Sequence, residues 1–175
     1  RVTEVTWHPT GRSILFSAAD RGAYVIYRVG VTDSIPEVVV GGRAQSRGIA
    51  LDGAGNQLAF IRTETTRPGE LFVRDLSTSR ERALTTLNDS WRQRVALQDA
   101  EEFWFTSFDG TRVQGWLMKP AGWVASERYP LILNIHGGPH SAFGYTFNDR
   151  FQQQAARGYA VAYINPRGSV GYGQA

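Results

Sequence analysis

Two nearly continuous apolar runs lie in the second half of the chain, YPLILNI at residues 129–135 and GYAVAYIN at residues 158–165. Strands of a parallel sheet that are covered on both faces have this pattern. Between the two runs, Phe147, Phe151 and Ala155 recur at a spacing of four residues, which places them on one face of a helix. The sequence therefore predicts a strand, a helix and a parallel strand, which together form a βαβ unit.

Cap and turn signals mark the ends of the predicted elements. Residues 146–149, Thr-Phe-Asn-Asp, resemble a capping box in which the hydroxyl of Thr146 accepts a hydrogen bond from the first turn. Gly158 supplies the left-handed residue that commonly ends a helix. Upstream, Asp109 and Gly110 separate the strand-like runs EEFWFTSF and TRVQGWLM, and Asp-Gly between such runs predicts a β-hairpin.

The first half of the chain contains an internal repeat. WHPTGRSILF at residues 7–16 aligns without a gap with LDGAGNQLAF at residues 51–60, an offset of 44 positions. In each copy a turn that ends in glycine leads into a short strand that ends at Phe16 or Phe60. Repeats of about 40 to 50 residues built from short strands are typical of β-propeller blades, although two unrelated β-meanders of similar composition would give the same pattern.

Each copy of the repeat continues into a second strand-like segment, AYVIYRV at residues 23–29 and ELFVRDL at residues 70–76. A propeller needs about four or more blades to close its ring, so further blades are expected upstream of Arg1. His8, in the turn sequence WHPTG, is expected to be a blade-turn residue. The chain stops inside a glycine-rich loop at Ala175, and we expect it to be a piece of a longer protein.

The first apolar run ends in HGGPH, residues 136–140, which is a candidate oxyanion loop. An oxyanion hole needs backbone N–H groups that turn inward without a side chain in the way, and Gly137 and Gly138 allow this. Pro139 has no N–H and fixes the chain that leaves the turn, so Gly138 is the favoured donor. A tight turn in which glycine only permits the geometry is the alternative, but an HGGG-type loop follows the equivalent strand in α/β-hydrolases.

His136 and His140 are four residues apart, but Gly-Gly-Pro between them excludes the helix that would bring two metal ligands onto one face. The catalytic histidine of an α/β-hydrolase comes last in chain order, so both histidines come too early to be the general base. We therefore expect His136 to be a wall residue of the substrate-binding site that orients the loop by hydrogen bonding. His140 is expected in the loop near the mouth of the cleft, and no metal site is expected.

A nucleophile elbow of the form G-x-S-x-G does not occur in the sequence, so Ser141 and Ser169 are expected to be turn and cap residues. The second apolar run ends in NPRGSVGYG, whose glycines run in the reverse order of the dinucleotide fingerprint, and no cofactor is expected. Arg167 in this loop can pair with a carboxylate of the protein or of a bound peptide, which makes it a candidate substrate-binding residue. The acidic pair Glu101 and Glu102 is expected to be solvated.

Composition narrows the classes of function. A hydrophobic fraction of 42% suits a globular protein with a core. The net charge of +3 comes from scattered arginines with Lys119 as the single lysine, so no nucleic-acid partner is expected. The chain has no cysteine and no apolar run of roughly 20 residues, so we expect no disulfide, no thiolate metal site and no membrane span. A cytoplasmic location fits these features, and export stays open because the sequence does not begin with methionine.

In this order, the propeller repeats, the Asp-Gly hairpin, HGGPH and NPRGSVGYGQ resemble the prolyl oligopeptidase family of serine peptidases. The histidine before the two glycines is similar to the acylaminoacyl-peptidase branch, since the other branches carry a tyrosine there. The resemblance implies β-propeller blades over residues 1–95, followed by the N-terminal part of an α/β-hydrolase domain over residues 96–175. It also implies that Gly138 gives one oxyanion donor, while the second donor and the Ser-Asp-His triad lie beyond Ala175.

The sequence therefore predicts part of a serine peptidase that hydrolyses short peptides, N-acylated ones among them, through an acyl-enzyme, and that is inactive by itself. Its expected partners are peptide substrates and the remainder of its own polypeptide, and a homo-oligomer is left open. Two rivals remain. One is an esterase or lipase with a similar HGG loop, against which the blade repeat argues, and the other is a non-catalytic propeller protein that binds partners.

Overall fold

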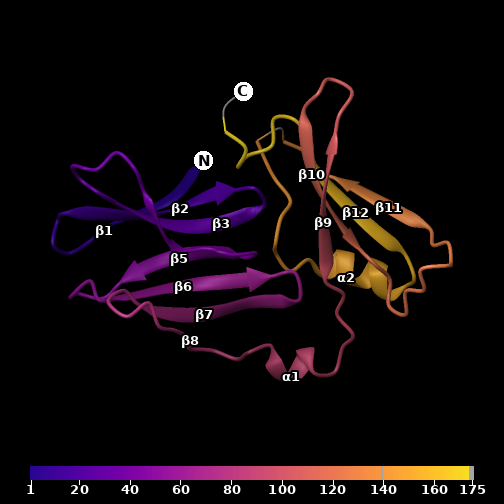
Figure 1. Cartoon of the computed structure of the whole chain (residues 1–175). Coiled ribbons are helices and arrows are strands. Elements are labelled where there is room, and N and C mark those ends of the chain that lie inside the picture. Colours follow the sequence, from indigo (N-terminus) through magenta and orange to yellow (C-terminus); the bar gives the residue numbers. More distant parts are fainter. Residues whose placement is uncertain (139, 174–175) are drawn as a thin grey trace.

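The computed structural model describes residues 1–138 and 140–173, so Pro139, which the sequence predicts to fix the chain leaving the turn, lies outside the described residues. Two sheets with two short helices make up this part of the chain (Figure 1). The first sheet is drawn from indigo to magenta, and the second from dark rose to yellow. The bounds of the eight strands in the first sheet are β1 (Val2–Trp7), β2 (Ser13–Asp20), β3 (Ala23–Gly30), β4 (Glu37–Val40), β5 (Gln45–Leu51), β6 (Gln57–Glu64), β7 (Arg67–Asp75) and β8 (Glu81–Ala83).

The first sheet consists of two antiparallel meanders, β1 to β4 and β5 to β8, joined by parallel pairing of Tyr24 with Gln45. Strands β2, β3 and β4 begin 44 residues before β6, β7 and β8, so the predicted repeat is confirmed. The predicted strand ends were wrong, because β2 and β6 continue past Phe16 and Phe60 to close tight turns with the next strand.

The two meanders bury their apolar side chains against each other, as propeller blades do. One buried cluster draws Leu15, Ile26 and Val40 from the first meander and Leu58, Phe60 and Phe72 from the second. The turns are in contact as well, because Nε2 of His8 lies 3.1 Å from the carbonyl oxygen of Gly55. His8 is thus a blade-turn residue, as the sequence predicts.

The second sheet has four strands in the order β11, β12, β10, β9. Strands β9 and β10 form an antiparallel hairpin whose turn is closed by the N–H of Ser107, 2.8 Å from the carbonyl oxygen of Thr111, with Gly110 at φ +83°. Strands β11 and β12 are parallel, and helix α2 lies between them in sequence, so the predicted hairpin and βαβ unit are both present. The bounds are α1 (Asp89–Arg92), β9 (Ala100–Thr106), β10 (Arg112–Met118), β11 (Leu131–Ile135), α2 (Asp149–Ala156) and β12 (Ala160–Asn165).

Helix α2 begins later than its predicted capping box. Its N-cap is Asn148, whose side-chain oxygen accepts from the N–H of Phe151 at 3.2 Å, so the assignment of Thr146 as the cap was wrong. Phe151 and Ala155 are buried as predicted, and Gly158 follows the helix at φ +90°. The prediction for Phe147 was wrong, because this residue precedes the N-cap and lies outside the helix. The sequence alone does not distinguish the two candidate caps, because both Thr and Asn are favoured N-cap residues. In the structure the cap is Asn148, three residues before the first buried position, Phe151.

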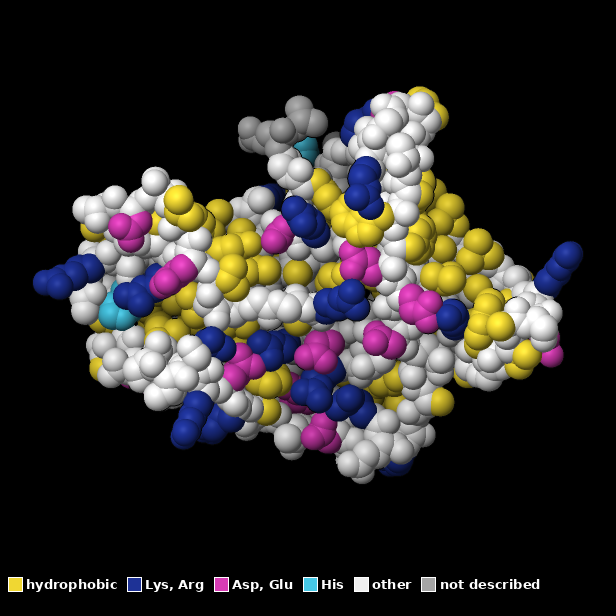
Figure 2. Space-filling model, viewed as in Figure 1, with side chains coloured by type: hydrophobic (Ala, Val, Ile, Leu, Met, Phe, Trp, Pro, Cys, Tyr) yellow, Lys and Arg dark blue, Asp and Glu magenta, His cyan; other side chains and the backbone are white. Residues whose placement is uncertain are grey.

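Strand β11 is covered on one face only, which contradicts the prediction of a strand covered on both. It is an edge strand, and Leu131, Leu133 and Ile135 are 60%, 51% and 64% exposed, whereas Ile132 and Asn134 point to the half-buried side. Hydrophobic side chains gather over the four-stranded sheet (Figure 2). A continuous apolar run predicts burial on both faces, but here the described residues cover only the face that packs on α2.

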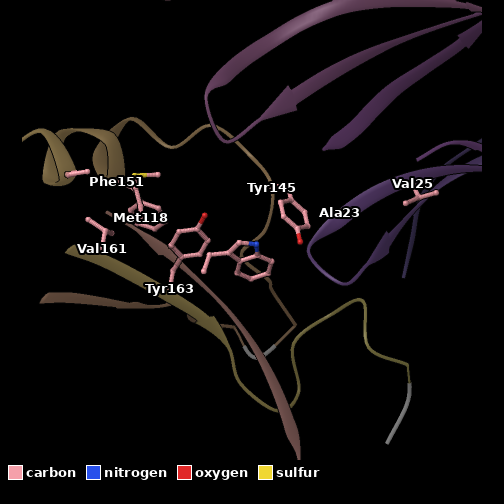
Figure 3. Packing of buried hydrophobic residues seen from close by; sticks show 9 residues of the cluster. Ala23, Val25, Met118, Tyr145, Phe151, Val161 and Tyr163 are labelled. Atoms are coloured by element: carbon pink, nitrogen blue, oxygen red, sulfur yellow. The ribbon is translucent and has the colours of Figure 1, made fainter. Parts of the chain in front are cut away.

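The two sheets share one core, because the turn between β2 and β3 inserts beside the second sheet. A buried cluster combines Ala23 and Val25 of β3 with Trp116, Tyr145 and Tyr163 of the other half of the chain (Figure 3). The ring of Trp116 is sandwiched, since it stacks on Tyr163 at 5.4 Å between centroids and meets Tyr145 edge-on at the same distance. Burying such aromatic rings stabilises the contact between the sheets by several kcal/mol, at about 25 cal/mol per Å².

Glycines permit this close approach. The carbonyl oxygen of Gly22 accepts from the N–H of Tyr145 at 2.9 Å, and the N–H of Arg21 donates to the carbonyl oxygen of Gly171 at 3.1 Å. A Cβ on Gly22 would lie 2.5 Å from the Trp116 ring, and a Cβ on Gly144 would collide with the backbone of Gly22. Residues 22 and 144 must therefore be glycine for the sheets to meet.

We predict that Gly22→Ala destabilises the chain more than Gly11→Ala does. Both glycines have positive φ, +79° and +68°, so alanine strains each by about 1–2 kcal/mol. Only Gly22 has a neighbour in the way, because nothing lies within 4 Å of a Cβ on Gly11, so overpacking Trp116 should add about 1–3 kcal/mol. Urea unfolding of both variants measures the difference, and equal losses would contradict the proposed close approach.

Candidate active site

Two loops that the sequence singles out lie at the same edge of the second sheet. The first loop begins with HGGPH directly after β11, and the second loop begins with NPRGSVGYG at the end of β12. These strands are parallel neighbours, with Ile135 paired to Ile164. Carboxyl ends of adjacent parallel strands are where ligands bind in open α/β sheets. The loops are therefore in the right place for a binding site, and their contacts show how they are held.

Asn165, the last residue of β12, ties the two loops together. Its side chain is buried, its Oδ1 accepts from the N–H of Phe143 at 2.8 Å, and its Nδ2 donates to the carbonyl oxygen of Phe143 at 2.9 Å. The amide thus pairs with a backbone segment as a neighbouring strand would. The same Nδ2 also donates to the hydroxyl of Tyr172 at 2.7 Å, which brings the end of the second loop into the same network.

His136 makes a second connection between the loops. Its Nε2 lies 2.8 Å from Oγ of Ser169, its Nδ1 lies 3.0 Å from the carbonyl oxygen of Gly137, and its ring meets Phe143 edge-on at 5.4 Å. These hydrogen bonds are the kind that a loop-orienting residue makes, and that role of His136 stays a prediction. Its predicted contact with substrate stays a prediction. His140 is exposed and lines the cleft described below, in keeping with its predicted position near the cleft mouth.

The two candidate oxyanion glycines differ in conformation. Gly138 has φ +153°, a backbone conformation that side chains rarely adopt, and a Cβ there would lie 2.9 Å from the backbone nitrogen of His140. Gly137 has nothing within 4 Å of a Cβ, so an alanine would fit. Within residues 1–138 and 140–173, no hydrogen bond is donated by the N–H of either glycine. Both residues are exposed.

An open cleft of about 1540 Å³ lies between the first sheet and the second loop. Asp20 of β2, His140, Arg167 and Ser169 are in its described lining, whereas Gly137 and Gly138 are not. His140 brings the HGGPH loop to this cleft, but the described lining does not enclose the amides of Gly137 and Gly138.

Arg167 forms an ion pair with Asp109 in the turn of the β9–β10 hairpin. Of the two partners that the sequence leaves open, the structure shows the carboxylate of the protein. The Arg167 side chain is still 63% exposed, so the pair anchors the second loop to the hairpin at its surface. Contact of Arg167 with a substrate stays a prediction.

Glu102 was wrongly expected to be solvated. Its carboxylate accepts hydrogen bonds from the hydroxyl of Tyr145 at 2.6 Å, Nε1 of Trp104 at 2.7 Å and Nε2 of Gln114 at 2.8 Å. Nη2 of Arg43, which lies between β4 and β5, is 3.4 Å from Oε2 of the same carboxylate. Its side chain is 20% exposed, against 64% for Glu101. Successive side chains of a strand point to opposite faces, so Glu101 and Glu102 cannot both face solvent on the same side of β9. This alternation is the sequence signal that indicates different environments for the two carboxylates.

The environment of Glu102 favours its charged form. Burial by itself would raise the pKa of the Glu102 carboxyl, but the hydrogen bonds from Tyr145, Gln114 and Trp104 and the charge of Arg43 outweigh it and hold the pKa below its ordinary value of 4.5. Burial, followed by the contact with Glu102, raises the pKa of Tyr145 to about 12. Glu102 is thus an ionised carboxylate that joins the two sheets through Arg43 and Tyr145.

Among the described residues, no group of three or more His, Cys, Asp or Glu side chains is placed to bind a metal ion. In the same part of the chain, neither helix has the length and apolar character needed to span a bilayer.

No family model matches the chain. Among curated proteins, the uncharacterized peptidase YuxL of Bacillus subtilis is 49% identical over 112 residues, which cover 64% of this chain and 17% of that protein. Dipeptidyl-peptidase 5 of Porphyromonas endodontalis is 30% identical over 131 residues, which cover 73% of this chain and 19% of that protein. The chain thus spans less than a fifth of the length of these relatives.

Solved structures give the same result. An acylaminoacyl peptidase in complex with Z-Gly-Gly-Phe-chloromethyl ketone matches with a TM-score of 0.86 and 29% identity, over 98% of this chain and 26% of that one. Acylaminoacyl peptidase of Pyrococcus horikoshii matches with a TM-score of 0.84, 29% identity and the same coverage. The strand-rich, propeller-like fold is thus that of proteins named as peptidases. The resemblance to the prolyl oligopeptidase family is confirmed, with acylaminoacyl peptidases as structural neighbours.

We predict that Glu102→Gln lowers the free energy of unfolding at pH 7 by about 1–2 kcal/mol, because a neutral amide is a weaker acceptor for three donors. The folded pKa of Glu102 lies below the unfolded value of 4.5, so its charged form stabilises the fold above pH 4.5, and this stabilisation is lost as the pH falls through the lower folded value. Urea unfolding at pH 7 and near pH 3 should show the gap between wild type and variant narrowing in acid.

The matched control is Glu101→Gln, because Glu101 precedes Glu102 on the same strand but is exposed. Its ion pair with Lys119 lies at the surface, so the change in unfolding free energy should stay within about 0.5 kcal/mol. A loss at Glu101 equal to that at Glu102, or a gap for Glu102→Gln that is constant with pH, would contradict the role given to Glu102.

Proposed function

We propose that this chain is part of a serine peptidase, in which residues 1–95 form the last blades of a propeller and residues 96–175 begin an α/β-hydrolase domain. The names of its relatives support the reaction class. The parallel pair β11 and β12, with α2 between them in sequence, supports the domain assignment. The observation that carries the proposal is the conformation of Gly138, which presents an amide at the end of β11 in a geometry that favours glycine.

In this proposal the N–H of Gly138 stabilises the transition state. When a serine hydroxyl attacks a peptide carbonyl, negative charge develops on the carbonyl oxygen, and a backbone N–H that is already free and oriented stabilises that charge without reorganisation. Gly137 is the second candidate for this role. Neither amide gives up a hydrogen bond to act, since none is donated by them within the described residues.

The remainder of the polypeptide would supply the nucleophile, the acid, the base and the second donor. The exposed apolar face of the second sheet supports this partner. Leu131, Leu133 and Ile135 on β11 and Phe105 on β9 are each 41% to 64% exposed on one sheet, which is an apolar surface suited to be covered by further structure. We propose short peptides, N-acylated ones among them, as substrates that reach the loops through the cleft beside the propeller-like sheet.

Titration of the full-length parent protein with a serine-directed organophosphate tests the mechanism. Stoichiometric labelling with loss of peptide-anilide hydrolysis is the expected result. Hydrolysis of acyl esters without hydrolysis of N-acyl or free peptide anilides would favour an esterase. Absence of both labelling and turnover would favour a non-catalytic propeller protein.

We predict that Gly138→Ala lowers kcat of the full-length protein by about 10²- to 10³-fold with little change in KM, because a displaced oxyanion donor acts on the transition state and not on substrate binding. Gly137→Ala is the matched control, since an alanine fits there and its N–H is kept. It should change kcat by only a few-fold. Steady-state kinetics on a peptide anilide measure both variants, and equal effects would remove Gly138 from the oxyanion hole.

A further inference from the structure

We propose that Ser169 is a positioning residue that holds the oxyanion loop through His136, an inference that rests on the oxyanion role proposed for Gly138. Ser169 is 33 residues from His136 in sequence, yet its Oγ lies 2.8 Å from Nε2 of that ring. His136 is the residue directly before the two glycines. A group that fixes this ring therefore fixes the start of the loop that carries the donors.

Ser169 is itself held in place. It is 8% exposed, its Oγ donates to the carbonyl oxygen of Pro166 at 2.6 Å, and its N–H donates to the same oxygen at 3.1 Å. The next residue, Val170, donates its N–H to the carbonyl oxygen of Ser141 at 3.1 Å. The turn that contains Ser169 is thus closed by its own hydrogen bonds to Pro166 and is joined to the first loop at Ser141. Because the serine is held in this way, its hydroxyl can fix the orientation of the His136 ring.

The hydroxyl of Ser169 fixes the direction of its hydrogen bond with His136. Ser169 has one hydroxyl hydrogen, and the contact with Pro166 uses it, so Nε2 of His136 must donate to Oγ of Ser169. The contact between Nδ1 of His136 and the carbonyl oxygen of Gly137 needs a further hydrogen on the ring. A neutral ring satisfies the contact with Ser169, and an imidazolium ring satisfies both. In either form, Oγ of Ser169 accepts a hydrogen bond from the N–H at Nε2 of His136.

This arrangement explains why a serine without a nucleophile elbow is buried at this position. The sequence predicts Ser169 to be a turn residue, and its bond to Pro166 agrees with that. The same Oγ also accepts the hydrogen bond from His136, so one hydroxyl both closes the turn in the second loop and orients the first loop. The nearby Ser141 is exposed, and no hydrogen bond of its hydroxyl occurs within the described ranges of the chain.

The test uses Ser169→Ala, His136→Ala and the double variant in the full-length protein, with Ser141→Ala as the matched control. Amide hydrogen exchange of the peptide that spans β11 and the HGGPH loop is measured first, because this readout does not depend on activity. We expect faster exchange in both single variants, no further increase in the double variant, and no change for Ser141→Ala. Equal exchange in Ser169→Ala and Ser141→Ala would overturn the proposal.

Kinetics then separate positioning from a general loss of structure. Misplacing the donors should lower kcat by roughly 10- to 100-fold with KM little changed, and the double variant should be no worse than either single variant. His136→Gln, which keeps an N–H donor of similar reach, should recover part of kcat relative to His136→Ala. Additive losses, or no recovery by glutamine, would overturn the action of Ser169 through the ring.

The two readouts also distinguish this proposal from the proposed function. Faster loop exchange in Ser169→Ala without an effect on kcat, or in a parent protein that has no hydrolase activity, supports the contact between Ser169 and His136. The same result removes the oxyanion role of Gly138. Unchanged exchange together with a normal effect of Gly138→Ala on kcat overturns the role of Ser169 and leaves the proposed function in place.

Discussion

The close approach between the β2–β3 turn and the segment that begins at Gly144 is the contact on which the rest of the structure depends. Tyr145 donates its backbone N–H to Gly22 and lies edge-on to Trp116, so one residue joins the turn of the first sheet to the core of the second. Interiors pack as densely as crystals, and a gap or an extra methyl at such a point is felt by all neighbours. The propeller-like sheet therefore contributes to the position of both candidate site loops, because the same turn also binds Gly171.

The loops themselves are held by side chains. Asn165 holds Phe143 by both of its backbone groups, and Ser169 holds His136 before the two glycines. Loops usually carry binding groups on a rigid scaffold. Here Asn165, at the end of β12, and Ser169, in the loop that follows β12, form the hydrogen bonds that hold the HGGPH side of the site. Within residues 1–138 and 140–173 neither glycine N–H donates a hydrogen bond, while Asn165 and Ser169 hold the residues around them.

Much of the fold is readable from the sequence because it follows from local patterns. The offset between the blade copies, the Asp-Gly hairpin and the helix between two apolar runs all depend on residues that are close in sequence. Burial is less readable, since the apolar run at β11 predicts cover on two faces and the described chain provides it on one. The role of Glu102 was missed for the same reason, because its partners Arg43 and Tyr145 come from distant segments that only the folded chain brings together. Ser169 was likewise identified only as a turn residue.

The pairing of Asn165 with Phe143 has a chemical consequence. Asparagine side chains age by deamidation, in which the backbone nitrogen of the next residue attacks the side-chain carbonyl to form a cyclic imide. The next residue here is Pro166, whose nitrogen carries no hydrogen and cannot take this route. Conversion to aspartate would turn the donor toward the Phe143 carbonyl into a repelling oxygen. The proline thus protects the amide that joins the two loops from a common form of protein damage.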